Sequence, residues 1–144
     1  MLAIVRPDSW NLPLFLHIFG ATVLFGTTAT VAIAGFASRT HAQHEKLLWR
    51  VAVRTFLLGV LPAYIVMRVG AQWIDGKEFP GGDEPGWVGV GFLVSDVGAL
   101  LLIVVGILLA VRRQRVLLAV PILTTLLVIA LGVAWVSMSG KPGS

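Results

Sequence analysis

The sequence predicts an all-α protein, a bundle of four transmembrane helices with both termini on the outer side of the membrane. Composition is the first reason, because 57% of the 144 residues are hydrophobic and only 12% are charged. Soluble domains average roughly 45–50% apolar and about 25% charged residues, which argues against an ordinary water-soluble domain. The chain has no cysteine, so disulfide frameworks and cysteine-ligated metal sites are excluded.

Four apolar segments are the second reason. A helix needs about 20 mainly apolar residues to cross a bilayer. Segments that satisfy this length cover residues 12–37, 47–74, 87–111 and 116–138, with Pro13 in the first turn of the first segment and Pro62 inside the second. No strand-like alternation competes with them, so a helical bundle is favoured over a barrel. We expect residues 1–144 to form a single membrane domain.

The distribution of charge is the third reason, and it predicts the orientation. Six basic residues lie in or beside the first and third connections: Arg39, Lys46, Arg50, Arg112, Arg113 and Arg115. The other side carries three: Arg6, Lys77 and Lys141. The basic side faces the cytoplasm in membrane proteins, which predicts an N-out, C-out topology in the plasma membrane. With no soluble basic face, nucleic acid is excluded as a partner, and the lipid bilayer is the expected one.

Tryptophans are placed where membrane interfaces are expected. Near the outer boundary we expect Trp10, Trp73, Trp87 and Trp135. Near the inner boundary we expect Trp49. Tryptophan is enriched at both interfaces, so these positions agree with the predicted spans.

Ionisable residues inside the spans are the candidate site. At about 1.5 Å per residue, His17, Arg68 and Asp96 lie about 8, 9 and 14 Å below the outer boundary, on three different helices. Each such group costs about 2.5–3.5 kcal/mol near a helix centre, so each requires a partner or a function. Arg54 is nearer the cytoplasmic side, where its long stem reaches the headgroups.

Helical spacing suggests which faces meet. On the second span one row carries most of the polar groups and should point into the bundle: Arg50, Arg54, Leu57, Leu61, Tyr64 and Arg68, continued by Gln72 and Asp75. The first span offers a face of mostly small or polar residues: His17, Gly20, Ala21, Leu24, Thr28, Val31 and Gly35. Gly91 and Gly98 form a close-packing row beside Asp96 on the third span.

We therefore expect an Arg68–Asp96 ion pair in the outer half, with Tyr64 and His17 nearby. The cluster has three interpretations that the sequence leaves open. It is a buried lock that fixes the helix register, a binding or proton-handling site, or a contact with a partner subunit. Removing one partner of such a pair should be worse than removing both.

Other chemistry has weaker support. His17 is the one weak candidate for a metal or haem ligand, but no other histidine lies in a span. His41 and His44 form an H-x-x-H pair that is expected to be a solvated helix start. Hydrolase and phosphate-binding motifs are absent, so we expect a protein that is not an enzyme and has no cofactor, with haem as the exception to test.

Two short motifs carry a resemblance. The opening Phe15-Leu16-His17-Ile18-Phe19-Gly20-Ala21, an L-H-x-x-G-A pattern followed by Gly26, resembles the first helix of small uncharacterised four-helix integral membrane proteins. Some of these are grouped loosely with copper-resistance D-like membrane proteins. The K-P-G ending at Lys141, Pro142 and Gly143 is similar to the ending of such chains. The resemblance implies a prokaryotic plasma-membrane protein and leaves its biochemical role open.

The expected function is an accessory or transport-related component of the plasma membrane, centred on His17, Tyr64, Arg68 and Asp96. It is expected to assemble with itself or with a larger membrane complex. One alternative is a haem-binding or redox-associated subunit that uses His17, and another is a small proton-coupled carrier that uses Asp96.

Overall fold

The computed structural model describes residues 8–82, 84–111 and 118–140, and these are helical apart from short connections. Its elements are η1 (Asp8–Trp10), α1 (Asn11–Thr40), η2 (Ala42–His44), α2 (Glu45–Thr55), η3 (Phe56–Val60), α3 (Leu61–Glu78), α4 (Gly86–Val111) and α5 (Ala119–Gly140). Four segments are long and apolar enough to cross a membrane: Asp8–Thr40, Ala42–Glu78, Gly86–Val111 and Ala119–Ser139. The predicted all-α class and its four apolar helices are confirmed.

The helices of the first two spans extend a few residues beyond the predicted limits at both ends. The predicted basic turn at Arg112, Arg113 and Arg115, the first residues of the predicted fourth span, and the K-P-G ending lie outside the described residues.

Pro62 explains why the second span has three parts. Its nitrogen carries no hydrogen, and its ring would clash with the carbonyl of Leu58, four residues earlier. The preceding residues, Phe56–Val60, form a π-helical turn, in which the Leu61 amide donates to the carbonyl of Phe56 five residues back. The wider turn accommodates the proline, so α2, η3 and α3 run on as one span.

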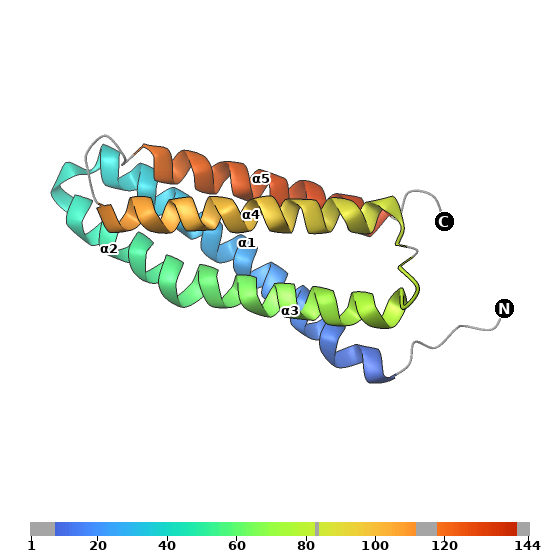
Figure 1. Cartoon of the computed structure of the whole chain (residues 1–144). Coiled ribbons are helices and arrows are strands. Elements are labelled where there is room, and N and C mark those ends of the chain that lie inside the picture. Colours follow the sequence, from blue (N-terminus) through green and yellow to red (C-terminus); the bar gives the residue numbers. More distant parts are fainter. Residues whose placement is uncertain (1–7, 83, 112–117, 141–144) are drawn as a thin grey trace.

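Figure 1 shows the four spans side by side, with α4 and α5 running together and α1 inclined across them toward α3. We call one half of the bundle the terminal half. It contains the start of α1, the end of α3, the start of α4 and the end of α5 (Figure 1). The other half, where α1 leads into α2, is called the opposite half.

Glycines make the close crossing of α1 and α3 in the terminal half. A Cβ on Gly20 would lie 2.7 Å from the Cα of Met67, and one on Gly70 would lie 2.9 Å from the Cα of His17. Only glycine permits two helix backbones to come this near. The crossing uses the predicted small-residue face of α1, on which Gly20, Leu24, Thr28, Val31 and Gly35 are all buried.

The predicted polar face of the second span needs correction. Its first part is exposed, because Arg50, Arg54 and Leu57 all point away from the bundle. The buried face lies one residue position away and consists of apolar, mostly small or medium-sized residues: Trp49, Ala52, Phe56, Val60, Ala63, Met67, Gly70 and Ile74. This face turns toward α1 because its residues allow closer packing between the two helices than the side chains of the polar row would. In the rest of the row Tyr64, Arg68 and Asp75 are half-buried, while Gln72 is exposed.

Trp49 also differs from its prediction. Its side chain is only 5% exposed and belongs to the hydrophobic core, so it is not an interfacial anchor facing lipid headgroups. By contrast Trp73 and Trp135 are well exposed, as residues at a membrane boundary are expected to be.

Candidate functional site: a cavity and its polar bridge

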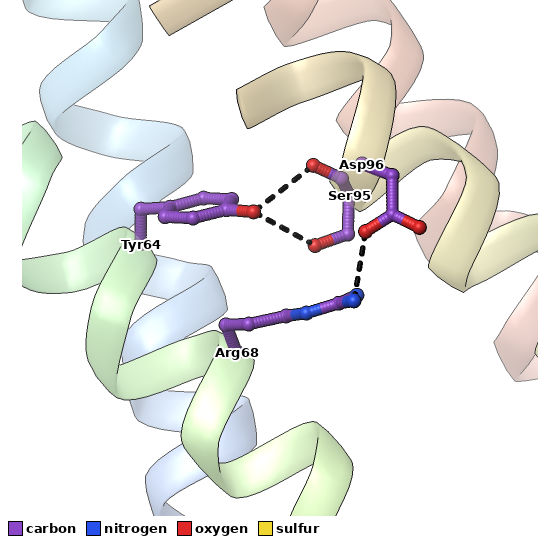
Figure 2. A network of polar contacts seen from close by, with 4 residues as sticks. All are labelled: Tyr64, Arg68, Ser95 and Asp96. Carbon is purple, nitrogen blue, oxygen red and sulfur yellow. Dashed lines mark hydrogen bonds and ion pairs between the residues drawn. The ribbon is translucent and has the colours of Figure 1, made fainter. Parts of the chain in front are cut away.

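Arg68 and Asp96 form the predicted ion pair. Arg68 lies on α3 and Asp96 on α4, and Nη2 of the guanidinium is 2.7 Å from Oδ1 of the carboxylate (Figure 2). Neither side chain is deeply buried, since Arg68 is 23% and Asp96 62% exposed. In a hydrocarbon layer each charge would be unfavourable alone, so the pair stabilises both at this depth.

A second contact lies beside the pair. The Tyr64 hydroxyl donates to the backbone carbonyl of Ser95 at 3.1 Å, and the Ser95 hydroxyl is 3.5 Å from the same phenolic oxygen. Figure 2 shows Tyr64 and Arg68 projecting from α3 toward consecutive residues of α4. The guanidinium carbon of Arg68 also lies 4.9 Å from the centre of the Phe92 ring, within the range of a cation–π contact.

These side chains join two helices whose backbones make few contacts with each other. Among the described residues, α3 makes its extensive backbone contacts with α1, while α4 makes them with α5. The ion pair and the tyrosine contact therefore form a bridge of side chains between α3 and α4. We call Tyr64, Arg68, Ser95 and Asp96 the polar bridge.

His17 is close to the bridge but bonds to the backbone. Its Nδ1 lies 3.2 Å from the carbonyl oxygen of Met67 on α3. A carbonyl only accepts, so Nδ1 of His17 carries the proton in this contact. The close approach at Gly70 brings the two backbones near enough for this bond.

A cavity of about 390 Å³ lies next to the bridge in the terminal half. All four spans contribute to its wall, which is mostly apolar. Polar groups in the wall are His17, Tyr64, Arg68, Asp75, Glu78, Ser95 and Ser139. A pocket with apolar walls and a few placed polar groups is the usual form of a small-molecule site, and its volume falls in the usual range of about 300–1,000 Å³.

Two buried polar atoms of this wall have no partner among the described residues. They are Nη1 of Arg68 and Oδ1 of Asp75. The two residues are seven positions apart on α3, which places Asp75 about 10 Å closer to the end of the bundle. Unpaired buried polar atoms are unfavourable, and a bound molecule is one way to satisfy them.

The structure brings three of the four predicted site residues, His17, Tyr64 and Arg68, to the cavity wall, while Asp96 lies outside that wall and is 62% exposed. The four do not form one network. Tyr64 and Arg68 contact neighbouring residues of α4, whereas the hydrogen bond of His17 goes to a backbone carbonyl. Sequence reasoning missed Ser95 and Phe92. Ser95 had a detectable signal, because it lies between Gly91 and Gly98 at helical spacing and is buried with them.

Asp75 was placed in the polar row by its spacing, but its part in a cavity was not foreseen. Glu78 lies beyond the predicted span of residues 47–74. Both became wall residues because α3 continues to Glu78, four residues beyond the predicted end of the span.

His17 is the one site residue with a ligand-forming nitrogen. Within the described ranges, no three histidine, aspartate or glutamate side chains lie close enough to hold a metal ion. The other two histidines, His41 and His44, lie at the connection between α1 and α2, in the opposite half. A comparison of the chain with family models, curated proteins and solved structures finds no match.

Proposed function

We propose that this protein is a multi-pass plasma-membrane protein that binds a small amphipathic molecule in the cavity beside the polar bridge. It would act as an accessory or transport-related component, alone or within a larger membrane assembly. The observation that carries the proposal is the 390 Å³ cavity, whose walls are mostly apolar and include two buried polar atoms that have no partner among the described residues. An apolar molecule alone would leave those atoms unsatisfied, and a fully polar one would leave the walls unmatched.

The physics of a membrane supports an occupied cavity. Lipid tails are as apolar as leucine, so a bilayer does not force helices together as water does. Helices joined by side chains across a gap are stable in lipid if something fills the gap. The polar bridge would fix the spacing of α3 and α4 and so keep the cavity open to an occupant.

Orientation is part of the proposal. Basic residues are concentrated at the connection between α1 and α2, where Arg39, Lys46 and Arg50 are exposed. The positive-inside rule supports a cytoplasmic location for that end. The terminal half, and the cavity with it, would then face the outside.

Native mass spectrometry can test the binding. The full-length protein is extracted from its own membrane with the surrounding lipids, and any retained small molecule is identified by its mass. Ala71→Phe introduces a phenyl ring at the cavity wall, whereas Ala110→Phe makes the same change on the exposed side of α4. We expect one retained molecule in the parent protein and in Ala110→Phe, and its loss in Ala71→Phe. Equal retention in both variants, or none in the parent protein, would contradict the proposal.

The cysteine-free sequence makes the orientation easy to measure. Single cysteines are introduced as Gly81→Cys between α3 and α4, and as Gln43→Cys between α1 and α2. In intact cells a membrane-impermeant maleimide should label the first and spare the second until the membrane is permeabilised. The reverse pattern would overturn the N-out, C-out assignment without affecting the binding proposal.

A further inference from the structure

The charges around the cavity do not balance, and this imbalance indicates the chemistry of its occupant. Its wall contains one arginine and two carboxylates, Arg68, Asp75 and Glu78. Arg68 is already paired with Asp96 on α4. The remaining charge of the wall is therefore negative and lies on Asp75 and Glu78, near the end of α3.

Asp75 is the group that most needs a partner. Its Oδ1 is buried and has no hydrogen-bond donor within the described part of the chain. Arg68, on the same face of α3, does not reach it. A carboxylate oxygen only accepts, so the missing partner must be a donor or a cation.

Aromatic rings gather around the same cavity. Six line its wall: Phe25, Tyr64, Phe79, Trp87, Phe92 and Trp135. The negative face of an aromatic ring attracts cations, and rings combined with carboxylates are the usual recognition site for alkylated ammonium groups. Phe92 already shows this behaviour, because it lies against the Arg68 guanidinium.

From these observations we infer that the occupant of the cavity is a lipophilic organic cation, such as an amine or an onium ion carrying apolar groups. Its charge would lie near Asp75 and Glu78, and its apolar part among the aromatic rings. The inference rests on the proposed function, since it assigns a chemical class to the molecule in the same cavity. An anion is disfavoured because its charge would lie beside Asp75 and Glu78, while Arg68, the one cation among the described residues of the wall, is already paired with Asp96. Nη1 of Arg68 still lacks an acceptor, and a neutral oxygen is enough to supply one.

A pair of ions with the same shape and opposite charge can test the inference. Tetraphenylphosphonium and tetraphenylborate carry four phenyl rings each and differ in the sign of their charge. Binding of each to the full chain in lipid nanodiscs is measured by equilibrium dialysis, with empty nanodiscs subtracted. We expect saturable binding of the phosphonium with a Kd at least about tenfold lower than that of the borate.

Matched variants locate the charge. Asp75→Asn should raise the Kd of the phosphonium about tenfold, because a charge-assisted contact is lost. Glu78→Gln is a second, independent variant one turn away, with an expected increase of about threefold. Glu84→Gln removes one negative charge from an exposed residue outside the wall and should leave the Kd unchanged. Thermal unfolding of each variant checks that the bundle is intact.

The outcomes separate this inference from the proposed function. Equal or tighter binding of the borate, no saturable binding of the phosphonium, or an unchanged Kd in both Asp75→Asn and Glu78→Gln would overturn the cation assignment. If Ala71→Phe still abolishes the binding of either ion, the cavity remains a ligand-binding site, but its ligand is not a lipophilic cation. If saturable binding of both ions is insensitive to Ala71→Phe, the proposed cavity function fails as well.

Discussion

The two halves of the bundle differ in how their helices are joined. In the opposite half the helices touch directly: a Cβ on Gly35 would lie 3.1 Å from Pro121, and one on Gly106 would lie 3.2 Å from the Phe56 ring. In the terminal half α1 and α3 approach each other even more closely, since a Cβ on Gly20 would lie 2.7 Å from the Cα of Met67, but α3 and α4 are joined by the polar bridge. Direct packing leaves no space between helices, whereas a bridge of long side chains leaves room for a cavity.

This difference shows which residues determine the fold and which form the site. Most residues of the hydrophobic core, among them Trp49, Phe56 and Val105, lie in the opposite half, so this half supplies most of the apolar packing that holds the bundle together. Each polar contact of the terminal half adds less stability than the apolar packing of the opposite half. The polar groups instead provide hydrogen bonds and charges that a bound molecule can use. We expect the loss of stability on substitution to follow the same division, and the three predictions below test it.

The largest expected effect is at Phe56, whose side chain is 3% exposed in the core of the opposite half. Phe56→Ala should lower the free energy of unfolding by about 3 kcal/mol or more, because it leaves a large void in close-packed surroundings. Phe25→Ala makes the same change at a half-buried residue of the cavity wall, which already borders empty space. Its cost should be about 1 kcal/mol.

Unfolding in mixed micelles with increasing denaturing detergent measures both variants. If Phe25→Ala lowered the free energy of unfolding as much as Phe56→Ala, the proposed difference between the two halves would be contradicted. It would mean that the terminal half is packed as tightly as the opposite half.

The Arg68–Asp96 pair has an intermediate expected effect. Arg68→Leu leaves the Asp96 carboxylate, and Asp96→Leu the half-buried Arg68 guanidinium, without its partner in an apolar, membrane-spanning part of the chain. Each should therefore destabilise the protein by about 2 kcal/mol, and the double variant should lose less than either single one. Unfolding of the four proteins gives a coupling energy through a double-mutant cycle. Strictly additive losses would show that the two side chains act independently, which would remove the bridge as the element that spaces α3 from α4.

The sequence was sufficient to predict the parts of the molecule that follow from the bilayer itself. Span number and helical class follow from length and hydropathy, and the Arg68–Asp96 pair follows from the cost of charge in hydrocarbon. The exposure of Arg50 and Arg54 could not be predicted in the same way. Periodicity identifies a polar row, but α1 packs against the row of Ala63, Met67 and Gly70 next to it.

The cavity could not be predicted from the sequence for a related reason. An empty volume depends on the distance between α3 and α4, and no local pattern encodes that distance. The roles of Asp75 and Phe92 depend on it too, because each acquires its role only when the facing wall is in place. Ser95 is the exception, because its position between two packing glycines is a sequence signal that could have identified it as a contact residue.

The smallest expected effect is at Tyr64, and it distinguishes the two polar contacts to Ser95. The phenol donates to the Ser95 carbonyl at 3.1 Å, while the contact of the Ser95 hydroxyl is longer, at 3.5 Å. Tyr64→Phe removes both contacts and should lower the free energy of unfolding by about 1 kcal/mol. Ser95→Ala retains the carbonyl, so its cost should be under about 0.5 kcal/mol. If Ser95→Ala were the more damaging variant, the hydroxyl and not the carbonyl would hold the tyrosine, and α4 would be joined to α3 through side chains alone.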